Sequence, residues 1–307
     1  MNVLSRLREA CARVADTASS VRIDRAAVPA YATALPLEAP TAAPDPTAHL
    51  IEGSGEEIAA FWLTLDAINF GSGWFPMLKK RPDRSGYFTI AMGVCDRFRA
   101  QGPWTAKELS RLDAARVADT LGQDPDHELM GLYAASLNDL GRHIHVQFGG
   151  QFSGPIEAAG GSAVALVERL AAWECFADSS RCDGLEVPFL KRAQIAAADL
   201  AEVGAAQFAD LEHLTMFADN LVPHVLRLDG ILRFDPGLVG RIDRRELIEH
   251  GSREEVEIRA CALHAVELIV AQRPGTHAAE LDRLLWHRGQ DPGYKASPRH
   301  RSRCTAY

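Results

Sequence analysis

The chain lacks an apolar run of the roughly 18 residues that a helix needs to cross a bilayer. Its six cysteines are scattered without a CxxC pair, so neither a disulfide framework nor a zinc knuckle is expected, and a reducing cytoplasm is the expected location. The first residues lack the apolar stretch of a signal peptide. Basic residues are outnumbered as well. The net charge of -8 argues against a protein that binds nucleic-acid backbones.

Lysine is scarce, since only five of the 33 basic residues are lysine. A lysine in a binding site of such a chain is expected there for its own chemistry, because the pKa of its compact ammonium shifts readily on burial. Lys191 is the candidate. It follows Pro188 at the predicted start of a helix, and Asp199 lies two turns further along the same face.

Strand-like alternation is sparse, and only Tyr87–Ile90 and Ile144–Phe148 are candidate short strands. Helical signals are frequent instead. One is the capping box of Ser252 and Glu255 before a long helix predicted to reach residue 272. The predicted fold is therefore mainly α, with at most a few short strands.

The 307 residues, 47% of them hydrophobic, can form one large core or two small ones. No internal repeat is visible, and we predict one compact domain over residues 1–307. Residues 1–55 are its N-terminal extension. They comprise an amphipathic helix over residues 1–18 and a Pro/Ala-rich exposed connection over residues 39–47.

One carboxylate interrupts the otherwise apolar segment 214–226. Leu214 and Met216 precede Asp219, and further apolar residues follow it. Burial of an unpaired carboxylate is costly, so this acid is expected to have a partner, a ligand or a catalytic role. The residue pattern leaves three interpretations open: Asp219 caps the helix that contains Pro223, pairs with a buried cation, or acts in catalysis.

Two further charged residues lie where burial is expected. Asp199 follows an alanine run and either binds substrate hydroxyl groups or pairs with Lys191 or Arg192. Arg259 lies on the core-facing stripe of its predicted helix. There its guanidinium either binds a phosphate in bidentate fashion or pairs with Glu255.

Aromatic residues gather around a Gly-rich loop at 69–76. Asn69, Phe70 and Phe88 are candidates to hydrogen-bond and stack on a flat base, with stacking worth about 1–3 kcal/mol per base. The alternative is that these rings belong to the core.

The densest basic cluster is Arg-His-Arg-Ser-Arg at residues 299–303. It forms either a solvated chain end or a phosphate contact, and chain ends favour the first. Metal signals are poor, because neither His143 with His145 nor His264 with Glu267 makes a complete ligand set. Neither a metal nor a cofactor is predicted.

Six segments, in the same order, resemble the queuosine-salvage protein family and together span residue 60 to the end of the chain. They are Asp-Ala-Ile-Asn-Phe at 66–70 with Trp74 and Phe75; Gly-Tyr-Phe at 86–88; Phe-Leu-Lys-Arg-Ala-Gln-Ile at 189–195; Met-Phe-Ala-Asp at 216–219; Glu-Val-Glu-Ile-Arg at 255–259; and Leu285-Trp286 before the basic cluster.

The resemblance implies an all-helical fold similar to helical DNA glycosylases, and hydrolysis of the N-glycosidic bond of queuosine 5'-phosphate to queuine and ribose 5-phosphate. Asp219 and Lys191 are implied as facing catalytic residues. The implied substrate-binding residues are Asn69, Phe70, Phe88, Asp199, Arg259 and Trp286.

Residue chemistry agrees with this reaction, since a carboxylate stabilises the positive charge that develops on the sugar or activates the water. Queuine is a 7-deazapurine and lacks the N7 protonation site of purines. Stabilisation of the sugar cation is therefore expected to matter more for catalysis. The expected partner is a small-molecule nucleotide, with no nucleic acid, membrane or obligatory protein partner. Two alternatives remain: a non-catalytic nucleotide-binding protein, and a base-excision glycosylase, which the net charge opposes.

Overall fold

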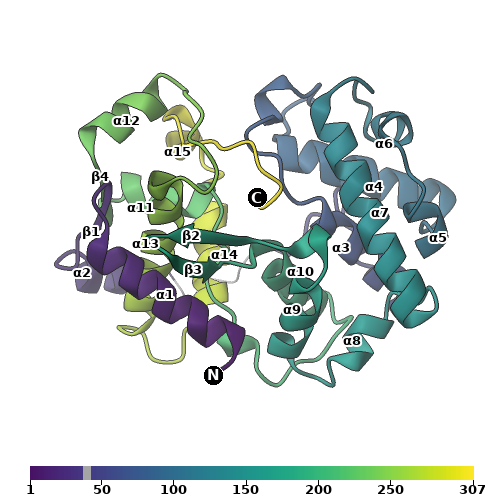
Figure 1. Ribbon diagram of the computed structural model, residues 1–307, viewed down its shortest axis with the longest axis horizontal. Helices are drawn as coiled ribbons and strands as arrows, with labels where there is room; N and C mark the ends of the chain where they lie inside the picture. Colours follow the sequence, from purple (N-terminus) through teal and green to yellow (C-terminus); the bar gives the residue numbers. More distant parts are fainter. Residues whose placement is uncertain (37–42) are drawn as a thin grey trace.

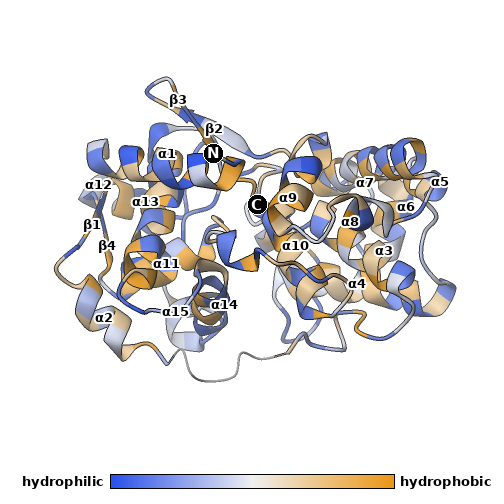
Figure 2. Ribbon diagram, turned by 90° about the horizontal axis from the view of Figure 1, so that it is seen from below, coloured by the Kyte–Doolittle hydropathy of each residue, from blue (hydrophilic) through white to orange (hydrophobic). Residues whose placement is uncertain are grey.

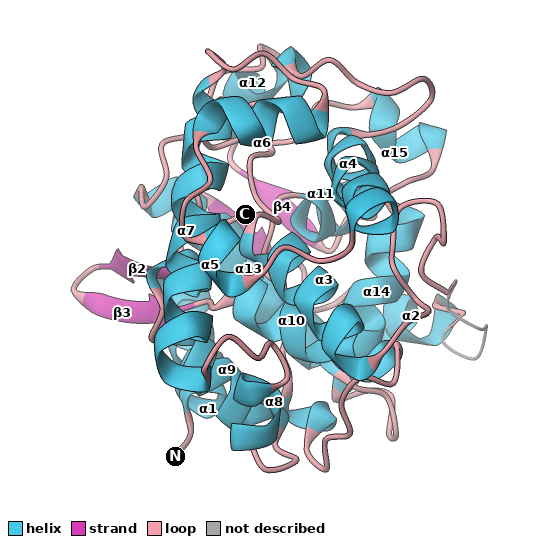
Figure 3. Ribbon diagram, turned by 90° about the vertical axis from the view of Figure 1, so that its right-hand side faces the viewer, coloured by secondary structure: helices cyan, strands magenta, loops and turns pink. Residues whose placement is uncertain are grey.

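Most of the residues that the structure describes lie in helices. The computed structural model describes residues 1–36 and 43–307, so positions 39–42 of the predicted connection lie outside the described residues. Fifteen α-helices and two two-stranded sheets in the described ranges confirm the prediction of a mainly α fold. Figure 3 shows the helices filling the fold and the β2–β3 hairpin at its edge.

Along the chain, a first helix and a short strand are followed mostly by helices. The α-helices are α1 (Val3–Thr17), α2 (Val28–Ala34), α3 (Gly55–Ala67), α4 (Gly86–Gln101), α5 (Ala106–Leu109), α6 (Ala114–Leu121), α7 (Glu128–Phe148), α8 (Gly154–Ala158), α9 (Ala163–Ala171), α10 (Lys191–Glu202), α11 (Leu221–Leu228), α12 (Pro236–Asp243), α13 (Arg253–Val270), α14 (Ala278–Arg288) and α15 (Pro292–Ala296). The strands are β1 (Val21–Ile23), β2 (Ser179–Cys182), β3 (Leu185–Pro188) and β4 (Leu232–Phe234).

The helices form two groups that lie side by side (Figure 1). Helices α3 to α10 make one group, and α1, α2 and α11 to α15 make the other. Figure 2 shows polar and apolar segments alternating along the helices, as expected where one face of each helix is buried. Buried apolar side chains from both groups, such as Leu63 and Leu263, belong to one continuous core. The assignment of one domain to residues 1–307 stays a prediction.

Both predicted strands are wrong. Residues 87–90 lie in α4 and residues 144–148 in α7. Their β-branched and aromatic residues fit a strand locally, but each stretch continues a longer helix whose buried face packs on the core. The actual strands pair antiparallel as β1 with β4, where Val21 faces Phe234, and as β2 with β3, where Ser179 faces Pro188.

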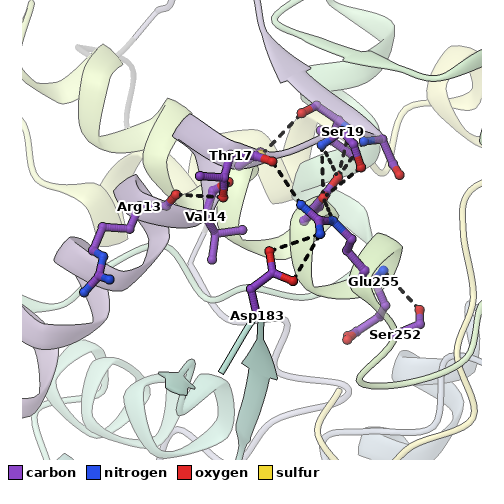
Figure 4. A network of polar contacts seen from close by, with 12 residues as sticks. Arg13, Val14, Thr17, Ser19, Asp183, Ser252 and Glu255 are labelled. Atoms are coloured by element: carbon purple, nitrogen blue, oxygen red, sulfur yellow. Dashed lines mark hydrogen bonds and ion pairs between the residues drawn. The ribbon is translucent and has the colours of Figure 1, made fainter. Parts of the chain in front are cut away.

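The N-terminal extension is bound to α13 by a buried carboxylate (Figure 4). Glu257 accepts hydrogen bonds from the backbone N–H groups of Ser19, at 3.0 Å, and of Ser20, at 2.6 Å. Arg253 pairs with the same carboxylate at 2.7 Å and donates to the Thr17 carbonyl at 3.0 Å. These contacts fix the end of α1 on α13, so the extension is an integral layer of the fold.

The predicted start of the long C-terminal helix is confirmed. Ser252 accepts a hydrogen bond from the Glu255 N–H at 3.3 Å, and α13 runs to Val270, two residues short of the predicted end. No helix of the described residues is both long enough and apolar enough to cross a membrane.

Candidate active site

A cavity of about 880 Å³ lies where the two helix groups meet. Its walls come from the 69–88 region, α10, the segment before α11, α14 and the stretch 295–301. Its volume is typical of sites that enclose a small molecule. Among the residues predicted for a site, the cavity is lined by Asn69, Phe70, Phe88, Lys191, Asp199, Asp219 and Trp286.

Asp219 lies on the cavity wall at the start of α11. The buried side chains of Met216 and Ala218 anchor the segment before it in the core. The Asp219 carboxylate accepts hydrogen bonds from the N–H groups of Leu221, at 2.7 Å, and Val222, at 3.2 Å. It therefore caps α11, as one of the three interpretations held, and still faces the cavity. Both N–H donors and the helix dipole stabilise its negative charge.

Lys191 is placed by a left-handed residue. Leu190 has φ 53° and ψ 36°, is buried, and turns the chain from β3 into α10. The Lys191 ammonium donates to the Asn69 carbonyl oxygen at 2.8 Å and to Asn69 Oδ1 at 3.2 Å. Burial lowers the pKa of Lys191, and the Asp219 carboxylate opposes that shift. Asn69 thus holds the ammonium, which shares the cavity with Asp219 without a direct ion pair.

Three carboxyl groups line one end of the cavity. Asp199 and Glu202 come from α10, and Asp282 comes from α14. Glu202 pairs with Arg283 at 2.6 Å, and Asp282 accepts a hydrogen bond from the Phe217 N–H at 3.0 Å. Burial and then the Glu202 charge raise the pKa of Asp199 to about 7. Burial and the Asp219 charge raise the pKa of Asp282 well above its usual range.

Aromatic rings form a wall beside these carboxyl groups. The centroid of the Trp286 ring lies 5.9 Å from that of Tyr87 and 6.2 Å from that of Phe88. All three rings are partly exposed to the cavity. Phe70 is only 2% exposed and packs edge-on against Tyr133, so most of its ring belongs to the core. Phe88 and Trp286 therefore offer more surface to a flat ligand than Phe70 does.

Three guanidinium groups that lie close to one another also line the cavity. Arg245, Arg299 and Arg301 make no ion pair with a carboxylate in residues 1–36 and 43–307. Burial lowers the pKa of Arg299, and the Asp219 carboxylate opposes that shift. Burial and then the Arg245 charge lower the pKa of Arg301. These three cations outnumber the one nearby carboxylate, Asp219, so this part of the cavity attracts an anion.

Arg259 does not line the cavity, which corrects the prediction that it binds substrate phosphate, and the alternative of a pair with Glu255 is confirmed at 3.6 Å. It is fully buried, and its guanidinium binds Asp178 through two contacts of 3.0 and 2.6 Å. Its Nε donates to the Ala218 carbonyl at 2.9 Å, next to Asp219. The ring of Phe189 covers it at 3.9 Å. With its donors and faces occupied, Arg259 positions the Asp219 segment instead of a ligand.

The basic C-terminal cluster is not a solvated chain end, so that interpretation is wrong. His300 and Ser302 are buried, and the His300 carbonyl accepts a hydrogen bond from Asn220 at 3.1 Å. The Gly71 N–H donates to the Tyr307 carbonyl at 3.0 Å. In Figures 1 and 2 the C-terminus accordingly lies between the two helix groups. This path carries Arg299 and Arg301 to the cavity.

Sequence reasoning missed Asp282 and Arg245. One signal was present for Asp282, which precedes Trp286 by four residues and so shares its helix face. Arg245 has φ 61° in the loop after α12, and no local pattern pointed to it. Among the described residues, no group of three or more His, Cys, Asp or Glu side chains is arranged to hold a metal ion.

Comparison with known proteins decides the family. The model of the family described as queuosine salvage protein matches residues 49–307. The chain belongs to the queuosine salvage protein family. A family member from Sphaerobacter thermophilus, named queuosine 5'-phosphate N-glycosylase/hydrolase, is 36% identical over 96% of this chain and 95% of its own.

Relatives with the same name occur in eukaryotes. The Dictyostelium discoideum protein is 30% identical over 80% of this chain and 77% of its own, and the mouse protein is 31% identical over 56% of each. The match to the queuosine salvage family includes every cavity residue from Asn69 to Tyr307 and excludes α1 and α2.

Proposed function

We propose that this protein hydrolyses the N-glycosidic bond of queuosine 5'-phosphate and releases queuine and ribose 5-phosphate. The observation that carries the proposal is Asp219, which is fixed by two backbone N–H groups on the wall of a nucleotide-sized cavity. The full-length similarity to a protein named for this reaction supports it. The six unpaired cysteines accord with a reducing compartment, and we place the reaction in the cytoplasm.

In this proposal the Asp219 carboxylate acts on the sugar. It stabilises the positive charge that develops at the anomeric carbon, or takes a proton from the attacking water. Lys191, held by Asn69, adjusts the charge and orientation of the site around Asp219. Phe88 and Trp286 stack on the base, with a smaller contribution from the buried Phe70. Arg259 holds the segment that carries Asp219 in place through its hydrogen bond to the Ala218 carbonyl.

The guanidinium groups of Arg245, Arg299 and Arg301 bind the 5'-phosphate. Guanidinium groups suit phosphate because they donate several hydrogen bonds in one plane. Arg299 lies near enough to Asp219 for the two charges to interact, as required when phosphate and anomeric carbon belong to one ribose. The phosphate thereby places the sugar over Asp219.

The proposed substrate is tested by the rate of base release from queuosine 5'-phosphate, queuosine and GMP. We expect release from queuosine 5'-phosphate to exceed the other two by at least tenfold in kcat/KM. Equal rates for the phosphate and the nucleoside would contradict a role for the phosphate, and preferred cleavage of GMP would contradict the base.

Replacement of Arg299 by alanine is expected to reduce the preference for queuosine 5'-phosphate over queuosine by about 10- to 100-fold, since a hydrogen bond to a charged group contributes about 1.5–3 kcal/mol. The measurement is the ratio of the two kcat/KM values. Arg303→Ala is the matched control, because Arg303 is exposed and does not line the cavity. A ratio unchanged in Arg299→Ala would remove Arg299 from the phosphate site.

A further inference from the structure

Two groups of like-charged side chains line the cavity. Arg245, Arg299 and Arg301 form a basic group, and the carboxyl groups of Asp199, Glu202 and Asp282 form an acidic group. Asp219 lies close enough to Arg299 and to Asp282 for its charge to act on a member of each group. A ligand that matches this cavity carries both a negative and a positive group.

Within this acidic group, only Glu202 has an ion-pair partner among the described residues. Arg283 pairs with Glu202 at 2.6 Å, but Asp199 has no hydrogen bond or ion pair with another side chain of the described residues. Asp282 is 5% exposed, and only one of its oxygens has a partner, the Phe217 N–H. Its other oxygen accepts no hydrogen bond from the described residues, and Asp282 lines the cavity.

A further buried acid, Asp66, also lacks a hydrogen-bond partner. Asp66 is fully buried, and neither of its carboxyl oxygens has a hydrogen-bond partner among the described residues. Burial and then the Asp199 charge raise the pKa of Asp66 well above its usual range. Uncompensated acids beside apolar rings are costly, so a bound cation would stabilise them. The rings of Tyr87, Phe88 and Trp286 add favourable faces for that cation.

Queuosine 5'-phosphate has the matching charges. Its 5'-phosphate is an anion, and carbon 7 of its base carries a methylene-linked secondary amine, which is protonated near neutral pH as alkyl ammonium groups are. We propose that Asp199, beside Glu202 on α10, binds this ammonium and so selects 7-deazaguanine bases with a cationic substituent over neutral ones. The inference rests on the proposed function for the identity of the substrate.

The test compares two free bases of similar size, 7-aminomethyl-7-deazaguanine, which is a cation, and 7-cyano-7-deazaguanine, which is neutral. Calorimetric titration of the protein at pH 7.5 is expected to give about tenfold tighter binding of the cation, the contribution of one charge-assisted hydrogen bond. Asp199→Asn is expected to lower that ratio about tenfold. The matched control, Asp119→Asn on the exposed face of α6, is expected to keep it.

Equal affinity of the unaltered protein for the two bases would overturn the inference even if Asp199→Asn fails to fold. An unchanged ratio in a folded Asp199→Asn variant would overturn it as well. Because the titration needs no turnover, it separates the two proposals. Preference for the cation without any cleavage would support the cation site at Asp199 and contradict the hydrolysis. Cleavage without such a preference would support the hydrolysis and contradict the cation site.

The same site predicts a pH dependence of binding. The pKa of Asp199 is raised to about 7, so its carboxyl is largely neutral at pH 6 and ionised at pH 8. Glu202, Arg283, Lys191, Asp66 and Tyr87 are the titratable or charged groups around it. The preference for the cationic base is therefore expected to increase about tenfold from pH 6 to pH 8, within the range that one ionisation allows. A preference that falls over this range would contradict the assignment to Asp199.

Discussion

Replacement of Asp219 by asparagine will lower kcat for queuosine 5'-phosphate by about 10³-fold while KM changes little. The size follows from the loss of a charge that is needed only when positive charge develops on the sugar. The amide oxygen of asparagine still accepts the N–H groups of Leu221 and Val222, so α11 keeps its cap. Initial rates over a range of substrate concentrations give kcat and KM separately.

The control for this substitution is Asp113→Asn. Asp113 also accepts a hydrogen bond from the first turn of a helix, the Arg116 N–H of α6 at 2.8 Å, although as the N-cap residue itself, and it does not line the cavity. Its activity and melting temperature are expected to stay close to those of the unaltered protein. An Asp219→Asn protein with a near-normal kcat would leave Asp219 as a structural cap and remove it from the chemistry.

Replacement of Arg259 by methionine will cost about 3–5 kcal/mol of the free energy of unfolding, the range for breaking a fully buried ion pair. The substitution leaves the Asp178 carboxylate buried without its two guanidinium donors. It also removes the hydrogen bond to the Ala218 carbonyl that holds the Asp219 segment. Urea unfolding followed by circular dichroism measures the change.

Arg111→Met is the matched surface substitution, because Arg111 is exposed on the loop after α5 and makes no ion pair with another described residue. It is expected to change the free energy of unfolding by less than about 0.5 kcal/mol. Asp178→Asn combined with Arg259→Met is expected to cost less than the sum of the single changes, since the Asp178 charge that Arg259→Met leaves unpaired is removed as well. A stable Arg259→Met protein with weakened binding of queuosine 5'-phosphate would instead return Arg259 to the substrate site.

Local sequence signals gave the fold class because they coincide with what packing requires. Ser252 caps α13 as its pattern indicates, and the apolar face of the first helix does pack on that element. The four strands were not predicted, because each has only three or four residues. Strands β1 and β4 also form only through pairing between distant parts of the chain, such as Val21 with Phe234. Residues 87–90 show the opposite failure, where local strand propensity is overruled by a helix.

The candidate site was predictable in part for a similar reason. Asp219 stood out because an acid in an apolar segment conflicts with its surroundings, and Lys191 because lysine is rare in this chain. The cavity adds Asp282 and Arg299, which come from α14 and the C-terminal segment. These residues come together only through the packing of the two helix groups, which local sequence patterns do not reveal. The phosphate-binding role of Arg259 was misjudged, because its buried guanidinium is satisfied by Asp178, far away in sequence, in addition to the predicted partner Glu255.

The most direct test of the central claim is identification of the products after incubation of the purified protein with queuosine 5'-phosphate, with the Asp219→Asn variant alongside. Chromatography with mass detection is expected to find queuine and ribose 5-phosphate in equal amounts from the unaltered protein and almost none from the variant. Bound but intact queuosine 5'-phosphate after long incubation would contradict hydrolysis and identify a nucleotide-binding protein in which Asp219 is a helix cap.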